Sequence, residues 1–286
     1  MTKQITVGYD GSKPSFDALL WAAAEAGTRG ARLRIMSCYE IPYAGEVAGG
    51  WAPTEAFAVL LERRKSALAE ISAVVAESTP GIEIVTEASP ELPATALIDN
   101  VDPHELVVVG ASSHRGAAAF WLGSTPRYVV RNSPCPVVVV RGEATPGRPD
   151  RIVVGVDGSR ASDRALHWAG DEADLHQARL VIVHSWMYPY LAVDAASSQA
   201  RDLTQVEAAC LVDRAVESAR ERFGAEVTGE LVEADPSDGL LDVVRGGDLL
   251  VVGSRGRGAL TAGLFGSTVN TVLDRCVVPV VVIPDV

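Results

Sequence analysis

The chain has 286 residues, of which 48% are hydrophobic and 22% are charged, and its formal net charge at pH 7 is −12. This composition is typical of a soluble globular protein, and the negative charge, without a lysine- or arginine-rich block, disfavours binding to nucleic acid or anionic membranes. No run of eighteen uncharged apolar residues occurs and the first residues lack signal-peptide features, so we expect no transmembrane helix and a cytoplasmic location. The four scattered cysteines are expected to be reduced thiols.

Strands and helices are expected to alternate along the first half of the chain. Short apolar runs predict strands, and apolar residues at helical spacing predict helices. The expected strands are Ile5–Tyr9, Leu33–Cys38, Ile82–Glu87, Leu106–Val109 and Val137–Val140. The expected helices are Ser15–Thr28, Thr54–Glu77, Pro93–Asn100 and Ser124–Asn132. Because nearly continuous apolar strands alternate with helices, we expect an α/β fold, with a doubly wound parallel sheet of five strands covered on both faces.

The same pattern returns in the second half of the chain. The segment Ile5–Ser12 matches Ile152–Ser159, so the matched aspartates Asp10 and Asp157 lie 147 positions apart. Later pairs, such as Gly110 and Gly253, lie 143 positions apart, so the first copy carries a net four extra residues, which we place within residues 42–54. A period this long indicates a duplicated domain. We predict one domain over residues 1–143, a Pro/Gly-rich linker over residues 144–150 and a second domain over residues 151–286.

An Asp-Gly-Ser turn ends the first strand of each copy, in the segments Gly8–Ser12 and Gly155–Ser159. In doubly wound sheets, ligands bind beyond the carboxyl ends of the strands, where the strand order reverses. With the order 3-2-1-4-5, that crevice lies between the first and fourth strands. The aspartates could accept hydrogen bonds from a ribose or an amino group. Alternatively, each aspartate caps the helix that follows, although the nearby serines offer other caps.

A glycine motif follows the fourth strand of the second copy. Gly253-Ser254-Arg255-Gly256 is followed, after nine residues, by Gly266-Ser267-Thr268. Glycines let the backbone approach a ligand closely, and the helix that begins at Gly266 offers N–H groups that favour phosphate. Arg255 and Arg257 add positive charge near the same place. With Gly258, the glycines form the pattern G-x-x-G-x-G, which is neither the Rossmann dinucleotide fingerprint nor a P-loop. The alternative is that these are ordinary turn glycines followed by an N-cap serine.

These features together resemble the universal stress protein family, and the tandem arrangement is similar to that of its two-domain actinobacterial members. The similarity covers both halves of the chain, and the second copy matches the motif in full. It implies an ATP site in each domain, with Asp157 at the adenosine end and Gly253–Thr268 around the phosphates. It also implies Mg²⁺ or Mn²⁺ bound mainly through the phosphates, and a pseudo-twofold pairing of the two domains through their last strands.

The first copy departs from the motif at one position. Gly110 and Gly123-Ser124-Thr125 match, but Ser113 stands where the second copy has Gly256, with Gly116 nearby. If position 113 requires a positive φ, serine would cost about 1 kcal/mol or more; its Cβ could also crowd the phosphates, or its hydroxyl could donate a hydrogen bond. The candidate nucleotide-binding residues are Gly8, Asp10, Ser12, Gly110, Ser113, Arg115, Gly116, Gly123, Ser124, Thr125, Gly155, Asp157, Ser159, Gly253, Ser254, Arg255, Gly256, Arg257, Gly258, Gly266, Ser267 and Thr268.

Other chemistry has weaker support in the sequence. The histidines show no metal-ligand spacing, and no nucleophile elbow occurs. His184, at the end of an apolar strand, is interpreted as a satisfied core histidine, and His114 could touch a phosphate or lie in solvent. We expect no catalytic residues.

The hypothesis that follows is an ATP-binding stress-response or regulatory protein whose ligand is an adenine nucleotide. The alternatives are a slow ATPase or adenylyl-transfer enzyme, and a scaffold that binds cyclic AMP or nothing. Its domains are expected to pair within the chain; a homodimer and a regulatory protein partner stay open.

Overall fold

A computed structural model describes residues 2–38, 54–99, 101–111, 122–141, 147–187, 196–256 and 266–285. The chain divides into two compact units, Met1–Gly147 and Arg148–Val286. Each unit contains five parallel strands and four helices among the described residues, and each is described separately below.

The first unit alternates strands and helices as expected. Its strands are β1 (Gln4–Gly8), β2 (Arg32–Cys38), β3 (Ile84–Ser89), β4 (Leu106–Gly110) and β5 (Val137–Val140). Its helices are α1 (Lys13–Arg29), α2 (Thr54–Ser78), α3 (Pro93–Ala96) and α4 (Ser124–Asn132). The third strand begins two residues later than predicted because Gly81, with φ of +90°, turns the chain before it. The third helix ends at Ala96 rather than at residue 100, and Leu97–Asp99 continue as turns.

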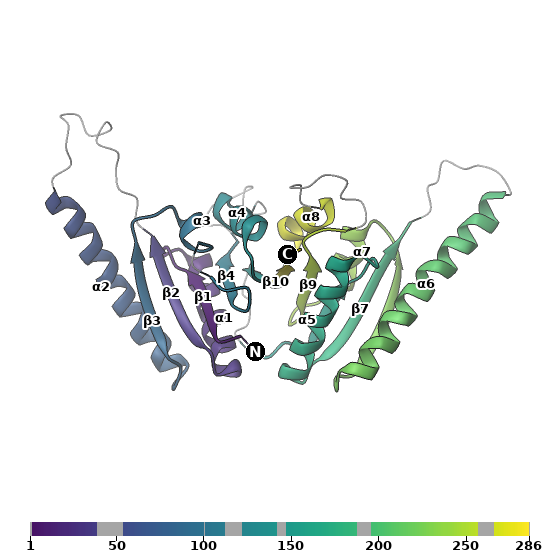
Figure 1. The fold of residues 1–286 in the computed structure, drawn as a ribbon, viewed down its shortest axis with the longest axis horizontal. Helices are drawn as coiled ribbons and strands as arrows, with labels where there is room; N and C mark the ends of the chain where they lie inside the picture. The colour runs from purple at the N-terminus through teal and green to yellow at the C-terminus, as the bar shows by residue number, and fades with distance from the viewer. Residues whose placement is uncertain are drawn as a thin grey trace, which may run out of the picture. The chain divides into compact units, whose positions relative to one another are not determined.

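The strands of the first unit are ordered β3-β2-β1-β4-β5, and every described pairing between them is parallel. Ile5 of β1 lies between Leu33 of β2 and Leu106 of β4. Figure 1 shows α2 alongside β3. The chain moves one way from β1 to β2 and the other way from β4 to β5, and right-handed crossovers therefore put α1 and α4 on opposite faces. The predicted doubly wound order 3-2-1-4-5 is confirmed.

The second unit repeats this architecture. Its strands are β6 (Arg151–Gly155), β7 (Arg179–Trp186), β8 (Val227–Glu233), β9 (Leu249–Gly253) and β10 (Val280–Ile283). Its helices are α5 (Arg160–His176), α6 (Ala196–Arg222), α7 (Pro236–Val243) and α8 (Ser267–Arg275). The strand order β8-β7-β6-β9-β10 matches that of the first unit, and every described pairing between these strands is parallel. The predicted pairing of the domains through their last strands stays a prediction.

Four of the strands, β4, β5, β9 and β10, are buried almost completely, which explains their continuous apolar sequences, whereas β3 and β8 are only partly buried. β4, β5, β9 and β10 expose almost none of their valines, leucines and isoleucines, because helices cover both faces of each sheet. All four cysteines are free thiols, as expected. In the part of the chain that the structure describes, no helix combines the length and the hydrophobicity needed to cross a bilayer.

The helices α1 and α5 end differently in the two units. α1 ends at Gly30, which has φ of +61°, whereas α5 ends at Gln177, which has φ of +50°. Each cap directs its backbone N–H to carbonyls of the last turn. A residue with a Cβ is strained in this left-handed conformation, whereas glycine is not.

Replacing Gln177 with glycine should therefore stabilise the protein by roughly 0.5–1 kcal/mol. The guanidinium of Arg148 donates to the backbone oxygen of Gln177 as well as to its side chain, and the backbone contact is kept in the variant. Gly30→Gln, at a position whose Cβ would meet no atom within 4 Å, should destabilise by a similar amount. Urea unfolding midpoints test both; equal midpoints for the wild type and Gln177→Gly would contradict the explanation.

Candidate functional site

A cavity of about 200 Å³ lies at the carboxyl ends of β1 and β4 in the first unit, where the strand order reverses. Many predicted site residues line it, namely Gly8, Asp10, Ser12, Gly110, Gly123, Ser124 and Thr125. The remaining lining residues are Tyr9, Pro14, Ser15, Met36, Cys38, Pro93, Leu97, Val109, Ala111 and Pro126. The site is thus polar at the Asp-Gly-Ser turn and at the start of α4, and apolar where β2 and α3 close it.

The apolar wall of the cavity was not among the residues predicted from the sequence. Met36 and Cys38 come from alternate positions of β2, and Leu97 follows α3. The pKa of the Cys38 thiol is raised to about 11 by burial, with Glu91 and Glu87 adding to the effect and Arg64 opposing it. The thiol is therefore protonated at neutral pH, and it contributes an apolar surface rather than a nucleophile. The alternation of β2 side chains was the available signal for this wall.

A close approach of two backbones brings the walls of the cavity together. A Cβ on Gly110, at the end of β4, would lie 2.5 Å from the backbone carbon and oxygen of Pro14 at the start of α1. No side chain fits there, so only glycine lets the end of β4 meet the first turn of α1. Gly253 in the second unit has the same relation to α5, with its Cβ position 2.8 Å from the backbone carbon and oxygen of Ala161.

The Asp-Gly-Ser turns of both units are held by the same hydrogen bond within the turn. The backbone N–H of Ser12 donates to Oδ1 of Asp10 at 2.9 Å, and that of Ser159 donates to Oδ1 of Asp157 at 2.9 Å. The serine hydroxyls, not the aspartates, cap the helices: Oγ of Ser12 and Oγ of Ser159 each accept from a first-turn N–H. The alternative in which each aspartate caps the helix is therefore wrong, and the aspartates hold the turn instead.

The carboxylate of Asp10 is held in its charged form. Burial opposes ionisation, but hydrogen bonds from the hydroxyls of Ser12 and Ser15 and from the backbone outweigh it and lower the pKa below 3.8. A lowered pKa in the folded state adds stability above the unfolded-state pKa, and this stability is lost as the pH falls through the folded-state value.

The wild type should accordingly be more stable than Asp10→Asn at pH 7, and the difference should shrink as the pH falls below about 4. Urea unfolding of both proteins between pH 7 and pH 2.5 measures the difference. A difference that stays constant over this range would show that the charge of Asp10 does not contribute.

The helices that follow β4 and β9 both begin at glycines. Gly123 is the N-cap of α4, and its N–H donates to the oxygen of Ala111 at 2.9 Å. Gly266 is the N-cap of α8, and a Cβ there would meet no atom within 4 Å. Neither helix has a side-chain cap among the described residues. The first turn of each nine-residue helix thus presents free backbone N–H donors and the positive end of the helix dipole. In the first unit, Ser124 and Thr125 of this turn line the cavity.

Gly256 is required for a reason other than the one that the sequence suggested. Its φ is not positive; instead, a Cβ would lie 2.6 Å from Oδ2 of Asp157. The glycine therefore lets the chain after β9 pass directly over the aspartate of the Asp-Gly-Ser turn. This contact joins two motifs about one hundred residues apart, and Ser113 is its counterpart in the first copy.

The other predicted residues fall into two groups. Gly155 ends β6, Ser254 is buried after β9, and Ser267 and Thr268 open α8. Arg255 lies with its Nη1 3.6 Å from Oδ2 of Asp285, a carboxylate that also pairs with Arg164 of α5. The predicted site residues that lie outside the described residues are Ser113, Arg115, Gly116, Arg257 and Gly258, together with His114.

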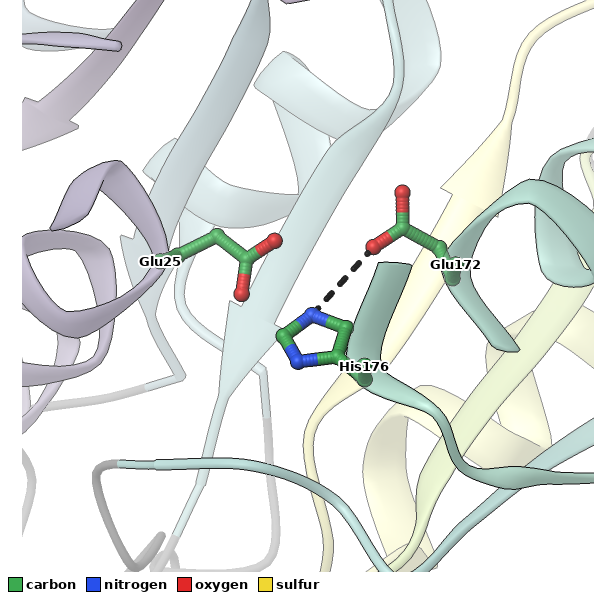
Figure 2. A group of neighbouring side chains, drawn as sticks. All are labelled: Glu25, Glu172 and His176. Carbon is green, nitrogen blue, oxygen red and sulfur yellow. Dashed lines mark ion pairs between the residues drawn. The ribbon is translucent and has the colours of Figure 1, made fainter. Parts of the chain in front are cut away.

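Each of the three histidines of the second unit has a polar partner, and Nε2 of His167 lies 3.3 Å from Nη1 of Arg222. Nδ1 of His184 lies 2.7 Å from the oxygen of Val156, which agrees with its interpretation as a satisfied histidine. His176 lies one helical turn after Glu172 on α5, and Nε2 of the histidine is 3.6 Å from Oε2 of the glutamate (Figure 2). Both side chains are buried. This pair was missed, although a glutamate and a histidine four residues apart on a predicted helix are a usable signal.

Comparisons with known proteins agree with the duplicated fold. A model of the universal stress protein family matches residues 1–141 and 149–284. The chain is 30% identical over 289 residues to a universal stress protein from Mycolicibacterium smegmatis, which covers 98% of this chain and 96% of that protein. The solved structure of a universal stress protein from Archaeoglobus fulgidus has a TM-score of 0.67 at 21% identity and covers 99% of both chains. A solved universal stress protein in complex with cAMP covers 48% of this chain and 97% of that chain, at 26% identity and a TM-score of 0.37.

Proposed function

Because this chain belongs to the universal stress protein family, we propose that each of its two domains binds an adenine nucleotide, ATP above all, at the carboxyl ends of β1 and β4 or of β6 and β9. The observation that carries the proposal is the cavity of the first domain, which joins an apolar wall, a charged aspartate and the start of a helix within one space. A nucleotide has the same three parts, namely a base, a ribose and phosphates.

Each part of the ligand has a chemically suitable partner in this arrangement. The base would lie against Met36, Cys38 and Leu97, and the ribose hydroxyls would donate to Asp10. The phosphates would lie at the first turn of α4, where N–H groups and the helix dipole favour negative charge. Asp10 is the only carboxylate among the described residues that line the cavity, so Mg²⁺ or Mn²⁺ would be held mainly by the phosphates.

The second domain supports the proposal through its glycine motif, which is complete in sequence. The turn around Asp157, the approach of Gly253 to α5 and the open N-cap at Gly266 repeat the arrangement of the first domain.

The described residues that line the cavity of the first domain favour binding over catalysis. Asp10 has a lowered pKa and is a poor general base at neutral pH, and Cys38 is protonated. A regulatory, stress-related role is therefore favoured over ATP hydrolysis or adenylyl transfer.

A valine at Gly266 tests the second site. Since a Cβ at this position meets no protein atom within 4 Å, the side chain would fill the phosphate space without opening the core. Gly266→Val should weaken ATP binding by the second domain at least tenfold. Gly123→Val, where the nearest atoms to a Cβ lie at 3.5 Å, should do the same in the first domain. Isothermal titration of the full chain with ATP, AMP and cAMP measures the affinities.

Gly246→Val is the matched control. This glycine also has no atom within 4 Å of its Cβ position, and it precedes β9, at the opposite end of the strand from the site. ATP affinity equal in the control and both site variants would overturn the proposal. Tighter binding of cAMP than of ATP at both sites would favour the cyclic nucleotide instead, and product release from ATP well above background would support the enzymatic alternative.

The close approach of Gly256 to Asp157 predicts that the two domains differ in their affinity for ATP. Gly256→Ser puts the residue of the first copy into the second, and its Cβ would displace either the chain after β9 or the aspartate. ATP binding by the second domain should weaken about tenfold, which corresponds to about 1.4 kcal/mol. Ser113→Gly is the reciprocal change and should strengthen the first site. Unchanged affinities in both variants would show that this position does not distinguish the domains.

A further inference from the structure

The two domains differ in charge beside their otherwise matching sites. Arg164, on the second turn of α5, corresponds to Asp17 of α1, and Arg255 corresponds to Ser112. Asp17 forms an ion pair with Lys13, its Oδ2 lying 2.8 Å from the lysine Nζ. The second domain thus carries two arginines where the first carries an acidic residue and a neutral one.

Both arginines lie close to the carboxylate of Asp285, beyond the carboxyl ends of the strands, where the proposed site is located. Arg255 follows the carboxyl end of β9, and Asp285 follows that of its parallel neighbour β10. Asp285 pairs with Arg164 through Oδ1 and lies 3.6 Å from Nη1 of Arg255 through Oδ2. Arg164 is three residues after Ala161, so these two residues lie on the same side of α5. The backbone of Ala161 lies against Gly253, at the end of β9.

We propose that Arg164 and Arg255 read the outer phosphates of the nucleotide in the second domain, and that Asp285 is the counter-ion they exchange for those phosphates. The ligand class assigned to the second site is therefore a nucleoside di- or triphosphate in preference to a monophosphate. This inference rests on the proposed function, because it concerns the same nucleotide site.

Exposure and charge both support an exchange of anions. The side chains of Arg164, Arg255 and Asp285 are 36%, 42% and 34% exposed, so their pairing is only partly shielded from water and is weak enough to be replaced. Guanidinium groups bind phosphate oxygens in the same forked geometry as carboxylates. A polyphosphate chain carries more charge than a monophosphate and extends further from the ribose, so it gains more from two arginines beyond the glycine motif.

The test uses the full chain in the Gly123→Val background, in which the first site is weakened and the tighter binding reports the second site, with ATP, ADP and AMP as ligands. Arg164→Gln and Arg255→Gln should each weaken ATP binding about fivefold and AMP binding less than twofold. Asp285→Asn removes the competing anion and should strengthen ATP binding about threefold. This gain should be lost when Arg255→Gln is also present, because the two residues act through one contact.

Asp17→Asn is the matched control for Asp285→Asn, since it removes the same negative charge, but at the α1 position that corresponds to Arg164 in the first domain; it should leave the ATP-to-AMP affinity ratio unchanged. The inference is overturned if neither arginine variant lowers that ratio, or if Asp285→Asn weakens ATP binding. Unfolding midpoints equal to that of the background protein show that the variants are folded. Failure of the proposed function is distinct, because the wild type would then bind none of the three nucleotides.

Discussion

The arrangement of each domain depends on one steric constraint, the contact of the last residue of a central strand with the backbone of a neighbouring helix. Gly110 meets Pro14, and Gly253 meets Ala161, at separations that leave no room for a Cβ. This contact fixes the first turn of α1 or α5 beside the end of β4 or β9. It therefore holds the Asp-Gly-Ser turn next to the glycine motif, and in the first domain the cavity lies at this junction.

Most of the fold could be predicted from the sequence because the signals are local. Buried strands such as Val137–Val140 are continuous apolar runs, and the duplication itself confirms each element twice. The polar half of the site was also predictable, because strand ends of a parallel sheet meet at one edge. The apolar half was not, since Met36, Cys38 and Leu97 look like ordinary core residues until strand and helix are placed together. The reason for Gly256 depends on a contact with Asp157 that no local pattern reveals.

The two copies share the fold and the hydrogen bonds of the Asp-Gly-Ser turn, and they differ at individual residues. The serine caps, the aspartate hydrogen bonds and the strand order are the same in both copies. The differences lie at Ser113 against Gly256, at Asp17 against Arg164 and at Gly30 against Gln177. The first two pairs belong to or adjoin the proposed sites, so they would change the ligand preference of a domain without changing its fold. Two related but unequal sites on one chain would let the protein respond to more than one nucleotide or concentration.

The most direct measurement is a crystal structure of the full chain grown with ATP at saturating concentration. The predicted result in the second domain is density for the ribose beside Asp157 and for the phosphates at the start of α8, near Gly253 and Gly266. Nucleotide density at another place, or none in either domain, would contradict the assignment of the strand ends as the nucleotide sites.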